Sequence, residues 1–129
     1  MKKLFNFIFV MIFFAVSIAH AEIEVYEDVG EFVIKNETLD FAKNQAKLSA
    51  ARNIAEQIFV KVKSSTEVKN SELIHDEIIL ESENFLHIVD VKYKLESEGG
   101  EILVKAFVTA EVDSEEIEKL IKKFKEVEQ

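Results

Sequence analysis

Few residues of this chain have the type and spacing that chemistry requires. The run His75-Asp76-Glu77 contains three side chains that can bind a metal ion, and His87 is the only other histidine after residue 21. In a strand, neighbouring side chains point to opposite faces, and the spacing implies no third ligand. We therefore expect no metal site, and we interpret His87, which precedes Ile88 at a predicted strand start, as an ordinary strand residue.

The sequence also lacks the motifs of common enzyme classes. It has no cysteine and no G-x-S-x-G motif, so no nucleophile is recognisable. Its three glycines, Gly30, Gly99 and Gly100, cannot build a phosphate-binding loop. Acidic residues are frequent, but none stands in a motif that separates general acid–base catalysis from solubility. We expect a protein that is not an enzyme and that uses no cofactor.

A candidate contact surface remains. On the last predicted strand, residues 102–112, the face opposite the core run includes Leu103 and Phe107 among polar neighbours. These two side chains lie either under the C-terminal helix or exposed, for a partner or for self-association. Because that helix must pack somewhere, we expect it to cover them. An unpaired edge strand offers a second way to recruit a partner.

The first residues have the pattern of an export signal. A positive start and an almost wholly apolar run precede Ala19 and Ala21, which stand at the two positions that a signal peptidase recognises. Cleavage before Glu22 makes residues 1–21 a signal peptide. The alternative is an uncleaved anchor, but the run is shorter than the roughly 20 apolar residues that span a membrane. We expect a periplasmic or secreted protein with no membrane span after cleavage.

The net charge and the cysteine content exclude further classes of partner and of binding site. Without Lys2 and Lys3 the chain keeps 14 basic and 25 acidic residues, a net charge of −11. Such a surface repels nucleic-acid phosphates and anionic lipid headgroups, so we expect no nucleic-acid partner. The absence of cysteine excludes disulfides, a lipoprotein anchor and thiolate metal sites. The stability of the exported chain must come from its core.

The elements that position this surface are organised around a predicted helix over residues 39–63, which Thr38 or Asn36 can cap. A ridge of small side chains recurs there at helical spacing: Ala42, Ala46 and Ala50. The ridge has no bulk, so a strand backbone can come close to it. A second apolar stripe beside the ridge suggests that the helix lies on a sheet and touches another helix.

Strands are predicted on both sides of this helix. Residues 22–35 form the first, where Gly30 indicates a bulge or a close backbone approach. Residues 67–80 form a second strand of poor alternation. Residues 89–96 and 102–112 alternate cleanly around a Gly-Gly turn and predict an antiparallel hairpin.

The chain ends in a predicted amphipathic helix over residues 113–128. Asp113 caps this helix, and Glu116, three residues later, completes a capping-box pattern. The predicted order is β-α-β-β-β-α. We therefore predict an α+β fold, in which a long helix and a C-terminal helix accompany an antiparallel sheet of about four strands. Residues 22–129, 108 in number, form a single domain.

Several of these patterns resemble the N-terminal domain family of flagellar assembly protein T, which is related to domains of small bacterial surface lipoproteins. The resemblance spans about residues 24–112. Its motifs are short patterns of small and apolar residues with turns: Gly30-x-Phe32-x-Ile34, then Asn36, then Ala42-x-x-x-Ala46-x-x-x-Ala50, then Ser65-x-Glu67, then Val68-Lys69-Asn70-Ser71-Glu72-Leu73, and finally Val104-x-Ala106-x-Val108-x-Ala110-x-Val112.

The resemblance implies a helix packed on an antiparallel sheet and a structural role in the periplasm. In flagellar assembly protein T that role is to build a ring around the basal body. Two departures limit the comparison. A glycine of the family is replaced near Asn84, and further domains of that protein have no counterpart after the last predicted helix. Ring assembly by those domains is not carried over, and the resemblance implies no catalytic residue.

Three functions follow from the sequence. The first is a non-enzymatic structural or assembly module of the envelope that acts through protein–protein contacts, with flagellar basal-body proteins, other envelope proteins or its own copies as partners. The alternative is a small binding protein that holds an apolar ligand between helix and sheet, although the alanine ridge favours close packing. A hydrolase with an unrecognised acid pair has no positive support.

Overall fold

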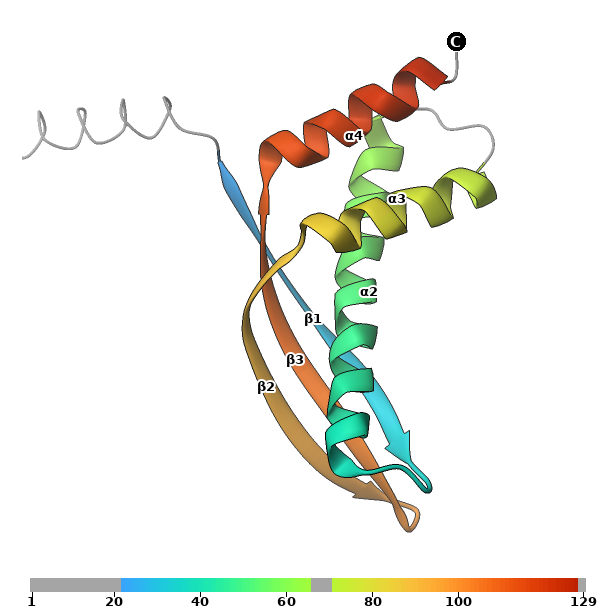
Figure 1. Cartoon of the computed structure of the whole chain (residues 1–129), viewed down its shortest axis with the longest axis vertical. Coiled ribbons are helices and arrows are strands. Elements are labelled where there is room, and N and C mark those ends of the chain that lie inside the picture. The colour runs from blue at the N-terminus through green and yellow to red at the C-terminus, as the bar shows by residue number, and fades with distance from the viewer. Residues whose placement is uncertain (1–21, 66–70, 128–129) are drawn as a thin grey trace, which may run out of the picture.

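The computed structural model describes residues 22–65 and 71–127 (Figure 1). The predicted signal peptide, with Ala19 and Ala21, lies outside the described residues, as does most of the motif over residues 65–73. Three strands and three helices follow in the order β1, α2, α3, β2, β3, α4. The α+β class and the antiparallel sheet are confirmed, but the sheet has three strands.

The sheet has the strand order β1-β3-β2, with both neighbours antiparallel. Its strands are β1 (Ile23–Ile34), β2 (His87–Glu98) and β3 (Glu101–Asp113). The predicted hairpin is confirmed: Glu98 pairs with Glu101 across a two-residue turn, in which Gly99 and Gly100 have φ of 60° and 83°. Left-handed backbone at both positions is what a tight hairpin turn demands of its residues.

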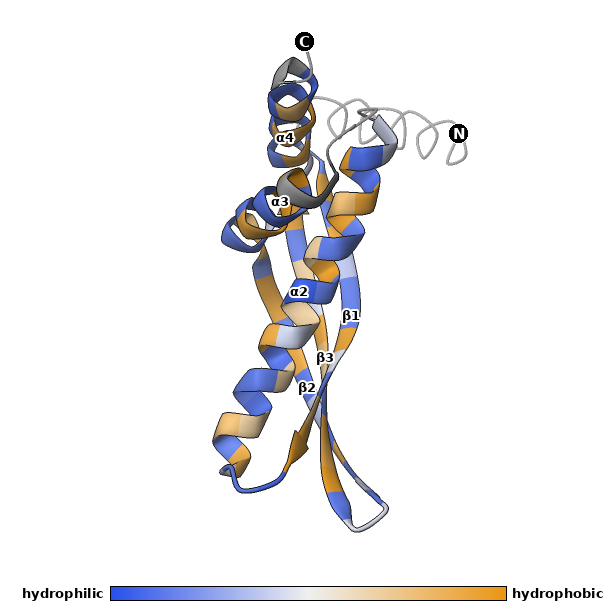
Figure 2. Ribbon diagram, turned by 90° about the vertical axis from the view of Figure 1, so that its right-hand side faces the viewer, coloured by the Kyte–Doolittle hydropathy of each residue, from blue (hydrophilic) through white to orange (hydrophobic). Residues whose placement is uncertain are grey.

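The long helix α2 (Leu39–Ser65) lies on one face of this sheet (Figures 1 and 2). It begins where Thr38 Oγ1 accepts a hydrogen bond from the Phe41 backbone N–H at 3.2 Å, as one of the two predicted caps. Its alanine ridge is fully buried. Gly30 of β1 faces that ridge, and a Cβ built on Gly30 would stand 2.0 Å from the Ala46 carbonyl oxygen and 2.3 Å from the Ala50 nitrogen.

The predicted close approach at Gly30 is therefore confirmed, and the alternative of a bulge is not, because the β1–β3 register runs unbroken through Gly30. One apolar core lies between the sheet and the helices. Five inward residues of β3 are buried in it, whereas Ile102 near the turn is exposed. The buried residues are Val104, Ala106, Val108, Ala110 and Val112.

The prediction of a strand over residues 67–80 is wrong. The described part of this region is helical and belongs to α3 (Ser71–Phe85). Ile78 and Ile79 are buried while Leu80 is exposed, so burial along this apolar run follows the period of a helix rather than the alternation of a strand. Ser82, four residues after Ile78, is also buried, which continues the same helical face.

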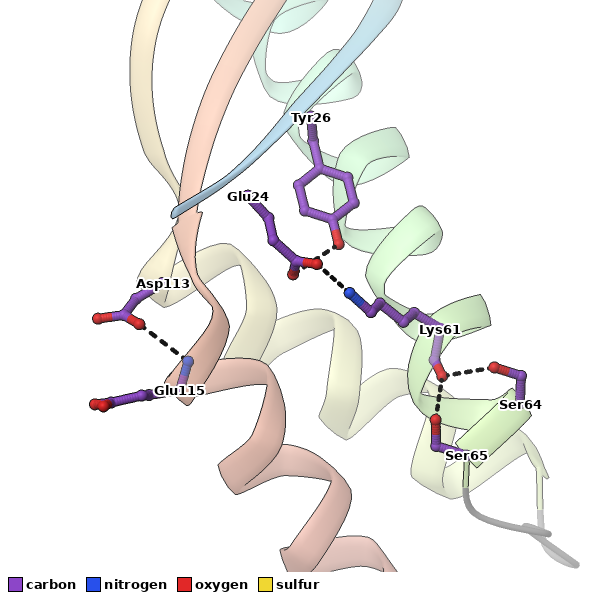
Figure 3. Close-up of polar contacts among 7 residues, drawn as sticks. All are labelled: Glu24, Tyr26, Lys61, Ser64, Ser65, Asp113 and Glu115. Atoms are coloured by element: carbon purple, nitrogen blue, oxygen red, sulfur yellow. Dashed lines mark hydrogen bonds and ion pairs between the residues drawn. The ribbon is translucent and has the colours of Figure 1, made fainter. Parts of the chain in front are cut away.

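The C-terminal helix α4 (Ser114–Val127) packs on the same side of the sheet as the other two helices (Figure 1). Asp113 Oδ1 accepts a hydrogen bond from the Glu115 backbone N–H at 3.0 Å, so the predicted cap is confirmed (Figure 3). Its apolar stripe enters the common core: Ile117, Leu120 and Phe124 are buried and Ile121 partly so. No helix in the described ranges is long and apolar enough to cross a membrane.

The contact at Gly30 gives a direct test of the fold. Gly30→Ala should lower the free energy of unfolding by about 3 kcal/mol or more, because the added methyl group meets helix backbone that cannot move aside alone. Gly99→Ala is the matched control. There a Cβ meets nothing within 4 Å, and only the positive φ costs about 1 kcal/mol. Equal losses in urea denaturation of the two variants would contradict the close packing of α2 on β1.

Candidate interaction surface

The face of the sheet that points away from the helices is the candidate interaction surface, and we call it the outer face. It includes both residues singled out from the sequence: Phe107 is 40% exposed and Leu103 is partly buried. Our expectation that the C-terminal helix covers them is wrong. That helix completes the core on the opposite face, where Ile117 and Phe124 are buried, so the outer face lies uncovered in the described chain.

Strand β1 adds apolar residues to the outer face that the sequence analysis did not assign to it. Because the strand passes Gly30 without a bulge, its odd-numbered residues all point outward once Gly30 points inward. Ile23 and Val25 are 56% and 60% exposed. Part of the signal was present in the sequence: the aliphatic residues before Gly30 have odd numbers, whereas Phe32 and Ile34 after it have even numbers and only Val33 there is odd.

Two apolar cross-strand pairs lie at the centre of the outer face. Val29 pairs with Phe107 and Val33 with Leu103, so both expected residues have an apolar neighbour on β1. Between these pairs Glu31 lies opposite Lys105, whose Nζ is 3.8 Å from the Glu31 carboxylate. Directly opposed side chains of this kind stabilise a sheet and also make a continuous surface.

An ion-pair cluster crosses all three strands of the outer face. Lys105 Nζ lies 3.1 Å from Glu96 Oε2, and Lys94 Nζ lies 3.4 Å from Glu96 Oε1. The hydrogen bond with Lys105 is the main cause that lowers the pKa of Glu96, and the same bond raises the pKa of Lys105. Both groups are charged at neutral pH, so the cluster offers fixed charges beside the apolar pairs.

The surface beside Phe107 is hollowed. An open depression of about 430 Å³ is bordered by Val29 and Phe107 on one side and by Asp90 and Lys92 of β2 on the other. A partner side chain placed there meets an aromatic ring, an aliphatic wall, the basic residue Lys92 and three acidic residues, Glu27, Asp28 and Asp90. This combination suits a protein partner, because large apolar groups ringed by polar ones are typical of protein interfaces.

The edge of the sheet next to β1 is occupied by polar side chains of α2. Asn53 donates a hydrogen bond to the Val29 carbonyl oxygen at 2.8 Å, and Gln57 donates one to the Glu27 carbonyl oxygen at 3.0 Å. Nearer the start of the strand, Lys61 forms an ion pair with Glu24 (Figure 3). These contacts cover peptide groups that an unpaired edge strand would otherwise present to another chain.

His75, from the run His75-Asp76-Glu77, lies elsewhere, between α3 and α2. His75 Nε2 is 2.8 Å from Glu56 Oε2, and its ring packs edge-on against Phe59 with centroids 4.5 Å apart. The hydrogen bond with Glu56 is the main cause that raises the pKa of His75. Because His75 and Asp76 lie on a helix, the strand argument against a metal site does not apply to them. In the described residues no group of three metal-ligating side chains is found.

The interpretation of His87 as a strand residue is confirmed, since His87 is the first residue of β2.

Comparison with known proteins adds no relative: no protein-family model matches the chain, and no curated protein matches it.

The contact between Glu56 and His75 should make stability depend on pH. A raised pKa in the folded state means that protonated His75 stabilises the fold below its ordinary pKa of 6.5, and that this contribution is lost as pH rises through the raised value. The variant Glu56→Gln should therefore lose more unfolding free energy at a pH of about 5.5 than at about 8.5.

Glu83→Gln is the control, because it removes a carboxylate from the exposed side of α3 that forms no ion pair among the described residues. Denaturation curves at the two pH values measure the loss of unfolding free energy in each variant. A loss for Glu56→Gln that is the same at both pH values would contradict the assigned role of His75.

Proposed function

We propose that this protein is a non-enzymatic structural or assembly module of the bacterial envelope, and that it acts through protein–protein contacts made by its outer face. The observation that supports the proposal is the uncovered pair of apolar contacts, Val29 with Phe107 and Val33 with Leu103, on a sheet whose helices all pack on the other side. Exposed apolar groups gathered on one face, with charged groups around them, favour an interaction site.

The composition of the outer face supports a protein partner rather than a nucleic acid or an anionic membrane. The exported chain has a net charge of −11, and such a charge repels phosphates. The two lysines of the ion-pair cluster, Lys94 and Lys105, are already engaged by Glu96 and Glu31. Affinity must therefore come mainly from apolar contact, with the charges providing register and selectivity.

The cellular setting of this proposal comes from the sequence. The predicted signal peptide supports action in the periplasm or outside the cell after cleavage. The resemblance to the N-terminal domain family of flagellar assembly protein T favours basal-body proteins as partners, and the flagellar version of the proposal depends on that resemblance alone. The general version, an envelope module that binds proteins, depends on the outer face.

The alternative of an apolar ligand held between helix and sheet has less support. Where α2 crosses β1, the backbones are so close that Gly30 leaves no space for a Cβ. An open hollow of about 670 Å³ does border α2, and its lining combines apolar residues such as Leu48 and Leu86 with charged ones such as Arg52 and Glu83. Sites for apolar ligands are usually concave and mostly apolar, and co-purification of a lipid with the native protein would be the sign of such a site.

The test replaces Phe107 by glutamate. In cells expressing the tagged full-length protein, crosslinking and affinity capture should recover envelope proteins with the wild type, and Phe107→Glu should reduce their recovery about tenfold or more, as expected for an apolar residue at the centre of an interface. Because Phe107 is 40% exposed, the variant should keep its fold, as judged by circular dichroism and thermal denaturation.

Val60→Glu is the matched control. Val60 is an exposed apolar residue of α2, on the helical side of the molecule, and it receives the same new charge. Equal capture by wild type and Phe107→Glu would refute the role of the outer face. Recovery of basal-body components by the wild type would support the flagellar version, and recovery of other envelope proteins alone would remove it.

A further inference from the structure

The two edges of the sheet differ in whether side chains from elsewhere in the described chain bind the backbone of the edge strand, and the uncovered strand is β2. At the β1 edge, Asn53 and Gln57 bind the carbonyl oxygens of Val29 and Glu27. At the β2 edge, no side chain from another part of the described chain is hydrogen-bonded to the strand backbone. Figure 1 shows the lower half of β2 at the margin of the sheet, whereas α3 lies near the upper end of the strand. This free edge is a template for another strand.

The peptide groups at the free edge can be assigned from the hairpin. A two-residue turn places a hydrogen bond between its flanking residues, Glu98 and Glu101. The even-numbered residues of β2 from Asp90 to Glu98, after the register shift at Ile88, therefore direct their peptide groups to β3. The odd-numbered residues from Val91 to Ser97 then direct theirs to the free edge. The same reasoning, applied through β3, sends the carbonyls of Glu27 and Val29 to the free edge of β1, where Asn53 and Gln57 bind them.

We propose that a second copy of this chain adds its own β2 to this edge, antiparallel, with the two-fold axis at Leu95, so that two three-stranded sheets become one of six strands. In this register Leu95 faces Leu95 of the other copy, and Tyr93 faces Ser97. These odd-numbered residues are the ones whose peptide groups are free to exchange hydrogen bonds. The proposal concerns the sheet edge and does not depend on the apolar pairs at the centre of the outer face.

Charge complementarity selects this register. With the axis at Leu95, Lys94 lies opposite Glu96 and Lys92 lies opposite Glu98, each twice by symmetry, and all four pairs are of opposite sign. These are non-hydrogen-bonded pairs, in which side chains come closest. Lys92 and Glu98 have no ion-pair partner within the described chain, so the second copy supplies one for each.

Neighbouring registers place like charges together. With the axis at Tyr93, Lys92 faces Lys94 and Asp90 faces Glu96. With the axis at Lys94 or at Glu96, the axial residue meets its own copy. Opposed like charges destabilise strand pairing, so the pattern along β2 favours one alignment over the others.

The exposed apolar side chains of β2 also favour a second copy of the chain as the partner. Leu95 is 52% exposed and Tyr93 39% exposed, although both lie on the face of β2 that points toward the helices. They are exposed because α2 lies over β1 and β3 and leaves the margin of the sheet uncovered. Pairing of two β2 strands brings these apolar groups of both copies together and removes them from water.

The test is a charge exchange at the unpaired positions. Sedimentation of the processed protein, purified from the envelope of cells expressing the full chain, should show a dimer. Lys92→Glu should weaken dimerisation about tenfold or more, since both symmetric pairs become repulsive, and Glu98→Lys should do the same. A mixture of the two variants should restore a one-to-one dimer, because all pairs between them are again of opposite sign. Lys122→Glu, an exposed residue of α4, is the control and should leave the dimer unchanged.

Three outcomes would overturn the proposal. A monomeric wild type at millimolar concentration is one, and a mixture of the two variants that stays monomeric is the second. The third is a dimer that Phe107→Glu abolishes and Lys92→Glu leaves intact, which would assign self-association to the outer face. Because the chain has no cysteine, Leu95→Cys gives an independent measurement: a short bis-maleimide should link two copies at this position and fail with Val25→Cys on β1.

Discussion

The close contact between Gly30 and the backbone of α2 is the constraint on which the rest of the structure depends. With a side chain at position 30, the Ala46 carbonyl and the Ala50 nitrogen would be overlapped, and the helix would have to lift from the sheet. With glycine there, the alanine ridge sits directly on β1. A helix that close to one strand cannot also cover the far strand, so α2 shields β1 and β3 and leaves much of β2 at the margin.

The position of α2 also decides which surfaces are free. It brings Asn53 and Gln57 to the edge of β1, where they bind two carbonyl oxygens of the strand, and Lys61 forms an ion pair with Glu24 nearby. The other two helices meet α2 in the same core, and Glu56 and His75 link α2 to α3. With the three described helices on one side, the opposite face and the β2 edge remain uncovered in the described chain, and these are the two surfaces to which we assign the proposed contacts.

Much of this arrangement was predictable from local sequence patterns. The alanine ridge and Gly30 together predicted a close approach, the alternating strands and two glycines predicted the hairpin, and Asp113 predicted the start of the last helix. Each of these depends on neighbouring residues, whose spacing reports directly on backbone geometry. Of the site, Leu103 and Phe107 were correctly placed on the face opposite the core run.

The parts that could not be predicted depend on contacts between distant segments. The run Ile78-Ile79-Leu80 has the same composition in a strand and in a helix, and only packing against α2 distinguishes them. Whether α4 lies over Phe107 or on the opposite face is decided by the space that α2 and α3 leave in the core. The contribution of Val29 and Val33 to the outer face required the register between β1 and β3, which no local pattern supplies.

The central claim is that the outer face is open in the isolated protein and covered in the cell. Labelling of single cysteines along β3 tests it most directly, because the natural chain has none. Leu103→Cys and Thr109→Cys should react quickly with a maleimide in the purified protein, and Ala106→Cys, on the core face, should react slowly. In intact cells the two outer positions should become protected. Outer positions that react as slowly as Ala106→Cys in purified protein, or as quickly in cells as in solution, would contradict the account.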